Sequence, residues 1–235
     1  MKTHIPYVKP SSTDIELGYV KDAVENGWGE KCYDYIHRFE DAFKKYLGVK
    51  YAMATSSCTG SIHLGLAALG IGPGDEVILP CPYWVSYSDI IKLKGGIPVE
   101  IKTSIENNFK MTGDQLKNCI NEKTKMVWFS SPCNPSGSVY NQKELKEIVD
   151  VLESHKNIFI VSDEIYEHIN YKGGHLSIGS FDTIKERTIT VNGVSKAFAM
   201  TGWRIGYIGA PEWIARACNK VQGQVTSGAN CIAQR

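Results

Sequence analysis

The chain has 235 residues, and its 26 lysine and arginine residues nearly balance its 25 aspartate and glutamate residues, which leaves a net charge of +1. This balance excludes the strong positive field of a protein that binds nucleic acid or an anionic membrane through its overall charge. Hydrophobic residues make up 43% of the chain, enough for a globular core, but no apolar stretch is long and unbroken enough to span a bilayer.

The N-terminal part of the chain, up to Gly48, predicts two helices. Thr13 is a suitable N-cap for a helix over residues 13–26, in which apolar residues recur at helical spacing and which Gly27 ends. A second helix is predicted over residues 33–47, with its apolar side chains on one face and Gly48 as its stop. We interpret residues 1–48 as an N-terminal helical segment, whose polar, proline-containing start is unlike a signal peptide.

From residue 49 to residue 235, apolar segments alternate with helical patterns. Strands are predicted over residues 50–54, 76–79, 97–100, 125–130, 158–163, 188–191 and 204–209. Helices are predicted over residues 60–69, 85–94, 112–120 and 143–155. Strands separated by helices indicate βαβ units, so the predicted fold class is α/β with a mainly parallel seven-stranded sheet flanked by helices. Such sheets bind ligands at the carboxyl ends of their strands.

The segment after the first predicted strand is rich in small and hydroxyl-bearing residues. Residues 55–61 read TSSCTGS and lead into a helix, so the backbone N–H groups near Thr59 and Gly60 are candidates to bind a phosphate. An ordinary helix N-cap explains the same residues and is the simpler interpretation of the segment taken alone.

Two further strand ends carry an aromatic ring and an amide. Trp84 follows the strand over residues 76–79, where its ring is a candidate either to stack on a planar ligand or to fill the core. Asn134 lies in the turn NPSG after the strand over residues 125–130, where its amide is a candidate to donate to a ligand oxygen besides shaping the turn.

The last three strands place charged residues in apolar settings. Asp163 ends a hydrophobic strand within the motif SDEIY, and we expect it and Tyr166 to face one crevice. Ser195 and Lys196 follow the next strand, and Arg204 is predicted to open the last one. Because an unpaired charge is costly to bury, Lys196 before the apolar run AFAMTGW predicts either a solvated lysine or a neutral, reactive amine in a partly desolvated setting.

Together these side chains match the needs of pyridoxal 5′-phosphate. Its phosphate requires helix N–H groups and an arginine, its ring requires a stacking face, and its pyridine nitrogen requires a carboxylate. Its aldehyde requires a lysine that is neutral often enough to form an imine. The sequence therefore predicts a site for this cofactor, in which Lys196 condenses with the aldehyde.

The remaining titratable residues show no second pattern. Seven scattered cysteines form no CxxC pair, and none lies at metal-ligand spacing from a histidine. We therefore predict reduced thiols in a cytoplasmic protein and no metal site. The six histidines are interpreted as structural or solvated, and Glu164 and Glu167 as residues of the local surface.

Taken together, SDEIY, NPSG and SKAFAMTGWRIGY make residues 80–235 resemble the fold-type I pyridoxal-phosphate aminotransferases, in particular their aspartate aminotransferase branch. The resemblance implies transfer of an amino group between an L-amino acid, aspartate above all, and a 2-oxo acid by a ping-pong Schiff-base mechanism. It also implies a homodimer and a large cofactor-binding domain over residues 49–235. A smaller C-terminal domain, which holds the arginine for the substrate carboxylate, is expected to follow and is absent from this chain.

The resemblance gives three of the candidates catalytic roles. Lys196 forms the imine with the cofactor and then moves a proton between the substrate and the cofactor. Asp163 pairs with the pyridinium nitrogen, and Tyr166 binds the ring oxygen together with Asn134.

The other candidates are implied to hold the cofactor. Trp84 stacks on its ring. Arg204 and Ser195 bind its phosphate, together with backbone groups near Thr59 and Gly60.

The part of the chain before residue 80 resembles a second group, the sugar-nucleotide aminotransferases of the DegT/DnrJ type, which share the fold and the cofactor. This part lacks the tyrosine-proline-glycine stretch of the aspartate aminotransferases. We therefore consider a junction of two related halves near residue 80, which predicts a break in packing at that position.

Three alternatives to an aspartate aminotransferase stay open. The part of the chain before residue 80 favours a sugar-nucleotide aminotransferase. The absence of a residue matching the carboxylate-binding arginine favours a fragment that binds the cofactor without turnover. A nicotinamide dehydrogenase requires a glycine motif after a strand, whereas GIGPG at residues 70–74 precedes one.

Overall fold

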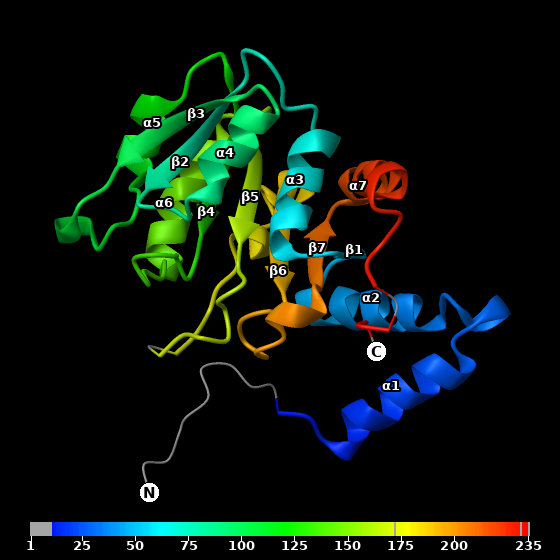
Figure 1. The fold of residues 1–235 in the computed structure, drawn as a ribbon. Helices are drawn as coiled ribbons and strands as arrows, with labels where there is room; N and C mark the ends of the chain where they lie inside the picture. The colour runs from blue at the N-terminus through cyan, green and yellow to red at the C-terminus, as the bar shows by residue number, and fades with distance from the viewer. Residues whose placement is uncertain (1–10, 172, 231, 235) are drawn as a thin grey trace, which may run out of the picture.

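Seven strands form one sheet, and helices cover both of its faces (Figure 1). The computed structural model describes residues 11–171, 173–230 and 232–234. The strands are β1 (Tyr51–Thr55), β2 (Glu76–Cys81), β3 (Ile97–Lys102), β4 (Thr124–Ser130), β5 (Phe159–Asp163), β6 (Thr188–Gly193) and β7 (Gly206–Ala210). Each of them overlaps a predicted strand, and the predicted α/β fold with a seven-stranded sheet is confirmed.

The order of the strands in the sheet is β1-β7-β6-β5-β4-β2-β3. The pairs β2–β3, β2–β4, β4–β5 and β5–β6 are parallel, whereas β7 runs antiparallel to both β6 and β1. Because β1 is antiparallel to β7, it has the same direction as β6. The carboxyl ends of β1 and of all the parallel strands therefore lie along one edge of the sheet, where β7 begins.

The described residues contain seven α-helices. They are α1 (Asp14–Asn26), α2 (Asp34–Leu47), α3 (Cys58–Ala68), α4 (Ser86–Leu93), α5 (Gly113–Cys119), α6 (Gln142–Glu153) and α7 (Glu212–Val225). Short 3₁₀ turns lie at Gly29–Lys31, Ile105–Asn107, Ile178–Ser180, Lys185–Arg187 and Thr201–Trp203. Thr13 caps α1 as predicted, in a capping box with Glu16. Gly48 ends α2 in the left-handed conformation, with φ of 66°. No helix among the described residues has the length and apolar character needed to cross a membrane.

Alternating side chains of the central strands build two hydrophobic cores. Met126 and Trp128 of β4 pack on one face of the sheet, in a cluster with residues of α3, α4 and α7. Val127 and Phe129 pack on the other face, with residues of α5 and α6. All four side chains are at most 2% exposed. β4 is therefore buried on both faces, as parallel strands between two helical layers are.

Two features near the C-terminus differ from the predictions. Arg204 does not open the last strand, because its backbone is left-handed with φ of 58°, and β7 begins at Gly206. α7 has no counterpart among the predicted helices. Its buried side chains Ile214, Cys218 and Gln222 recur four residues apart, which is the spacing of one helical face.

The described residues show no break in packing near residue 80. Residue 80 itself lies inside β2, which pairs with β3 on one side and β4 on the other. β1 precedes residue 80 and pairs along its whole length with β7 from the C-terminal part. The two halves of the chain therefore share one sheet, and the break expected of a junction is not found.

Gly206 is required where β7 passes the start of α3. A Cβ atom at this position would lie 2.4 Å from the carbonyl carbon of Ser57 and 2.5 Å from the amide nitrogen of Cys58. Because both neighbours are backbone atoms, Gly206→Ala must push α3 away from β7. We expect this variant to lower the free energy of unfolding, measured with urea, by about 3 kcal/mol.

Gly223→Ala is the matched control for that prediction. Gly223 lies inside α7, and a Cβ there would meet nothing within 4 Å. The added methyl group is expected to stabilise the helix by up to about 1 kcal/mol. Equal stability of the Gly206→Ala chain and the unchanged chain would contradict the close approach.

Candidate active site

The candidate residues lie on loops and helix starts along the edge where the parallel strands end. Ser130 at the end of β4 pairs with Asp163 at the end of β5, and Asp163 in turn lies beside β6. Thr55 of β1 and Gly193 of β6 both pair with Gly206, at the start of β7. The register of the sheet therefore gathers loops that are far apart in the sequence.

The start of α3 combines an ordinary cap with free backbone donors. The Ser57 hydroxyl accepts a hydrogen bond from the amide of Gly60 at 3.0 Å, and the Ser57 carbonyl accepts one from Ser61 at 2.9 Å. Among the described residues, the amides of Cys58 and Thr59 in the same first turn have no acceptor. The cap and the phosphate cradle considered for this segment are thus compatible, because the cap uses a different amide.

Asp163 is a buried carboxylate that accepts three hydrogen bonds. The Tyr87 hydroxyl donates to its Oδ2 at 2.6 Å, while the Ile165 amide and the Cys58 thiol donate to its Oδ1 at 3.2 Å and 3.4 Å. Burial raises the pKa of Asp163, and these three hydrogen bonds act in the opposite direction. A negative charge held in this way is suited to a cationic N–H donor on a bound ring.

Asn134, Tyr166 and Lys196 come together from three different loops. The Asn134 amide donates to the Tyr166 hydroxyl at 3.4 Å, and the Lys196 ammonium nitrogen lies 6.0 Å from the centre of the Tyr166 ring. The positive charge of Lys196 also lowers the pKa of the Cys58 thiol, although burial and Asp163 outweigh it. Lys196 is therefore close enough to Cys58, a hydrogen-bond partner of Asp163, for its charge to act on that thiol.

Lys196 lies on an exposed turn after β6, which corrects the partly desolvated setting expected for it. The apolar side chains that follow it in the sequence do not cover it, since Phe198 is 53% exposed and Trp203 is 37% exposed. Within this chain, the lysine therefore corresponds to the solvated alternative that the sequence left open.

The same turn holds the two predicted phosphate ligands. Ser195 is buried, and its carbonyl accepts a hydrogen bond from the Thr201 hydroxyl at 3.0 Å. Arg204 is exposed, and its guanidinium donates to the Thr201 carbonyl at 2.9 Å. Thr201 thus links Ser195 and Arg204 through two hydrogen bonds.

Trp84 is half-buried just before α4. It packs edge-on against Tyr87, with 5.8 Å between the ring centres. The ring centres of Tyr87 and Trp128, which lies in the core, are 4.0 Å apart. Trp84 thus packs partly against the core, and its stacking on a ligand stays a prediction.

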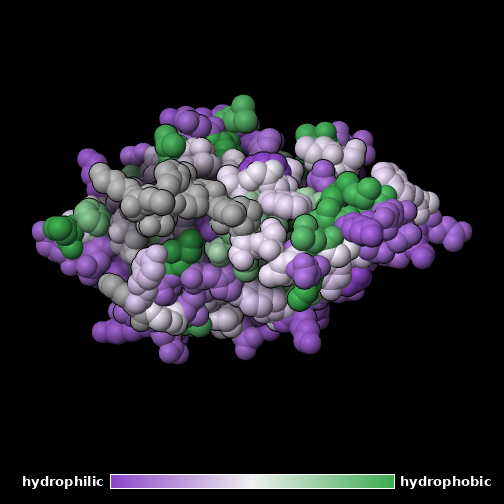
Figure 2. Space-filling model, turned by 60° about the horizontal axis from the view of Figure 1, so that its bottom comes forward, coloured by the Kyte–Doolittle hydropathy of each residue, from purple (hydrophilic) through white to green (hydrophobic). Residues whose placement is uncertain are grey.

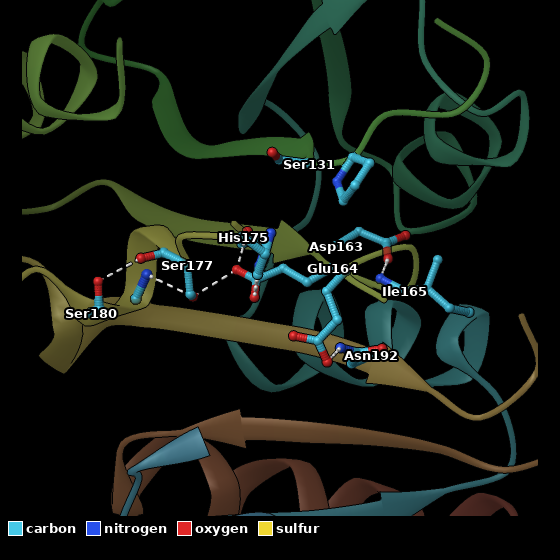
Figure 3. A network of polar contacts seen from close by, with 12 residues as sticks. Ser131, Asp163, Glu164, Ile165, His175, Ser177, Ser180 and Asn192 are labelled. Carbon is cyan, nitrogen blue, oxygen red and sulfur yellow. Dashed lines mark hydrogen bonds and ion pairs between the residues drawn. The ribbon is translucent and has the colours of Figure 1, made fainter. Parts of the chain in front are cut away.

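The carboxylate of Glu164 points away from that of Asp163 and into a second polar network (Figure 3). Glu164 accepts hydrogen bonds from the Ser162 hydroxyl at 2.8 Å, the Ser177 hydroxyl at 2.7 Å and the His175 ring at 2.9 Å. It is 1% exposed, so the prediction of a surface role for Glu164 was wrong. His175 pairs with this buried acid, which is the structural role that was one of the two interpretations of the histidines.

The His175 pair predicts a pH-dependent stability. Burial lowers the pKa of His175, but the hydrogen bond and charge of Glu164, with Glu167, raise it above its ordinary value of about 6.5. The folded protein therefore holds this proton more tightly than the unfolded chain. The resulting stabilisation is complete below the unfolded pKa and is lost as pH rises through the folded pKa.

Urea unfolding at a series of pH values between about 6 and 9 tests this effect. The fall in the free energy of unfolding over this interval is expected to shrink in His175→Gln. The control His63→Gln, at an exposed histidine of α3, should keep the full fall. An identical pH profile for the unchanged chain and His175→Gln would contradict the prediction.

Two hydrogen-bond partners of the Asp163 carboxylate were absent from the sequence-based candidates. Cys58 and Tyr87 lie 105 and 76 residues before Asp163 in the chain, and no local pattern reveals contacts over such distances. A weak signal exists for Tyr87. It follows the candidate Trp84 by three residues and lies in the first turn of α4.

Comparison with known proteins gives a consistent result along the chain. Residues 30–234 match the family model described as aminotransferase class I and II. An aspartate/prephenate aminotransferase of Nitrosomonas europaea is 51% identical over 225 residues, which is 94% of this chain and 56% of that protein. An aspartate aminotransferase of Pyrococcus abyssi is 49% identical over 174 residues, which is 74% of this chain and 44% of that protein.

Solved structures show the same similarity. The aspartate aminotransferase of Rhizobium meliloti superimposes with a TM-score of 0.86 at 32% identity, covering 98% of this chain and 60% of that one. The aspartate aminotransferase of Thermus thermophilus, solved with maleate, gives a TM-score of 0.84 at 32% identity, covering 97% of this chain and 60% of that one.

These matches also bear on how much of its relatives the chain spans and on the resemblance stated for the part before residue 80. The chain spans only a third to just over half of the curated relatives, for example 34% of a bifunctional aspartate and glutamate/aspartate-prephenate aminotransferase of Petunia hybrida. The family model and the Nitrosomonas match both run through residue 80. The resemblance of the part before residue 80 to sugar-nucleotide aminotransferases is not shown by either.

Proposed function

The chain belongs to the class I and II aminotransferases, and from this premise we propose that it moves an amino group between an L-amino acid and a 2-oxo acid. Its cofactor is pyridoxal 5′-phosphate, on which this family depends. The proposed amino acid is aspartate, which the names of its relatives from Nitrosomonas, Pyrococcus and Bacillus subtilis support.

The observation that carries the proposal is the buried carboxylate of Asp163 beside the cluster of Lys196, Tyr166 and Asn134. Asp163 lies at a strand end, is 4% exposed and receives its three hydrogen bonds from within the fold. An ionised carboxylate in such a place requires a positive partner to offset its burial. The pyridinium nitrogen of the cofactor is a partner with the required charge and a single N–H group.

The other residues fit the remaining parts of the cofactor. When bound, pyridoxal 5′-phosphate supplies an aldehyde that exchanges amines and a ring that withdraws electrons from the substrate carbon. Lys196 is proposed to hold the aldehyde and to move the proton, and Tyr166 and Asn134 to donate to the ring oxygen. Trp84 is proposed to cover the ring.

The phosphate is proposed to lie between the start of α3 and the turn after β6. Support comes from the amides of Cys58 and Thr59, which have no acceptor within the described residues. Further support is that Gly206, two residues after Arg204, lies against the backbone of Ser57 and Cys58 at the start of α3.

We propose a homodimer in the cytoplasm as the working state. Support for the dimer comes from the large apolar side chains that α1 and the turn after β6 leave exposed, among them Ile15, Leu17, Phe198 and Trp203. Figure 2 shows hydrophobic side chains gathered over part of the face on which α1 lies. The cytoplasm is supported by the six described cysteines, all of which are free thiols.

A half-reaction tests the proposed function. The chain is loaded with pyridoxal 5′-phosphate, freed of excess cofactor and mixed with L-aspartate without any 2-oxo acid. We expect one oxaloacetate per bound cofactor. Bound cofactor without oxaloacetate would make the chain a cofactor-binding fragment, and reaction with an amino-sugar nucleotide in place of aspartate would favour the sugar-nucleotide class.

A further inference from the structure

The carboxylate of Asp163 is held by donors from two separate helices. Cys58 is the first residue of α3, and Tyr87 is the second residue of α4. Both side chains are buried, with 8% and 2% of their surface exposed. Tyr87 is further fixed by the Trp84 and Trp128 rings, so its hydroxyl has little freedom to turn away from Oδ2.

Both donors keep their protons at neutral pH. Burial raises the pKa of the Cys58 thiol and of the Tyr87 hydroxyl well above their ordinary values, and the negative charge of Asp163 raises each of them further. A thiolate or phenolate beside this carboxylate is therefore strongly disfavoured. The S–H and O–H groups act as hydrogen-bond donors and not as nucleophiles.

The donors leave little room for further hydrogen bonds on Asp163. An ionised carboxylate offers about four acceptor positions, two on each oxygen. Cys58 and the Ile165 amide take both positions on Oδ1, and Tyr87 takes one on Oδ2. One position, on Oδ2, remains for a donor from outside the fold.

We propose that Cys58 and Tyr87 are positioning residues that orient Asp163 and present one free lone pair, on Oδ2, to a single ring N–H group. The inference rests on the proposed function, because the ring is that of pyridoxal 5′-phosphate. It adds that ring recognition depends on a thiol from α3 and a phenol from α4, neither of which touches the cofactor nitrogen.

The test compares two ligands that differ at one atom. Dissociation constants are measured by equilibrium dialysis for pyridoxal 5′-phosphate and for its 1-deaza analogue, in which a carbon replaces the ring nitrogen. The variants are Tyr87→Phe and Cys58→Ala, which remove the donors, and Cys58→Ser, which keeps one. A purely structural defect weakens both ligands, whereas a defect in presenting Asp163 weakens only the ligand with a ring nitrogen.

Matched controls carry the same chemical changes elsewhere in the core. Cys218→Ala removes a buried thiol of α7, and Tyr140→Phe removes a buried hydroxyl that accepts from the Met111 amide. Neither residue hydrogen-bonds the Asp163 carboxylate, whose partners among the described residues are Tyr87, Cys58 and the Ile165 amide. Both controls should bind the two ligands as the unchanged chain does.

We expect Tyr87→Phe to weaken binding of pyridoxal 5′-phosphate about 10-fold, as the loss of a hydrogen bond to a charged group does. Cys58→Ala should weaken binding of the cofactor about 3-fold, since a thiol is a weaker donor than a hydroxyl. Cys58→Ser should restore the affinity, because the serine hydroxyl can donate in place of the thiol. Affinity for the deaza analogue should stay within about 2-fold of the unchanged chain in every variant, because it has no N–H group for Asp163.

Equal losses for both ligands, or variants that behave as their controls do, would overturn the inference and leave the proposed function standing. An unchanged chain that binds neither ligand would remove the proposed function, and the inference with it. The two failures are therefore distinguishable in one set of measurements.

Discussion

The Lys196→Ala chain is expected to lose all covalent attachment of pyridoxal 5′-phosphate. Among the described residues, Lys196 is the lysine whose ammonium group lies over the Tyr166 ring, and its charge also acts on Cys58, a hydrogen-bond partner of Asp163. Alanine has no amine to hold the aldehyde or to move the substrate proton. Oxaloacetate release in the half-reaction with aspartate should fall by roughly 10²- to 10⁴-fold, the range that general acid–base catalysis contributes.

Borohydride reduction followed by mass measurement of the intact chain checks the loss of attachment. Lys143→Ala is the control, because Lys143 is an exposed lysine of α6 and is not among the proposed cofactor ligands. It should be labelled to the same extent as the unchanged chain. Normal labelling of the Lys196→Ala chain would refute the assignment of this lysine.

Asp163→Asn is expected to weaken cofactor binding at least about 100-fold, or roughly 3 kcal/mol, because it removes the negative partner of a buried positive charge. Asparagine has nearly the same size but cannot ionise. Its amide nitrogen also replaces one of the two oxygens that Tyr87, Cys58 and the Ile165 amide require as acceptors. Equilibrium dialysis measures the affinity, and circular dichroism confirms that the variant folds.

Glu164→Gln is the informative contrast for that variant. Glu164 is the next residue and is also buried, but its carboxylate serves His175, Ser162 and Ser177 on the opposite side (Figure 3). We expect this variant to unfold at a lower temperature and to bind the cofactor with unchanged affinity. Equal affinities of the Asp163→Asn chain and the unchanged chain would contradict the pairing with the ring nitrogen.

Much of the fold was predictable because its signals are local. Apolar segments of five to seven residues, such as β4, alternate with amphipathic helices that begin at capping residues, as at Thr112 and Asn141. α7 has no side-chain cap, since Pro211 precedes it, and its apolar face is interrupted by the polar residue Gln222. A helix without a start signal and with a polar buried residue is difficult to identify from sequence.

The location of the site followed from topology, but its internal contacts did not. Placing candidates at strand ends required only the alternation of strands and helices. The hydrogen bonds of Cys58 and Tyr87 to Asp163 depend on how two helices dock against the sheet, which no local pattern encodes. Glu164 is buried because His175 and Ser177 return over it from a loop more than ten residues further along the chain.

The exposure of Lys196 is the clearest difference between the prediction from the sequence and the structure. The apolar run after this lysine predicted desolvation, but the run forms an exposed turn in which Phe198 and Trp203 keep much of their surface accessible. An apolar sequence buries a neighbour only if the fold covers it.

The measurement that tests the central claim most directly is the location of the cofactor adduct. The purified chain is incubated with pyridoxal 5′-phosphate, reduced with borohydride and digested, and the labelled peptide is identified by mass spectrometry. The account predicts a single major adduct on the peptide that contains Lys196. Labelling scattered over exposed lysines, or no labelling, would contradict it and show that this chain does not assemble the cofactor site.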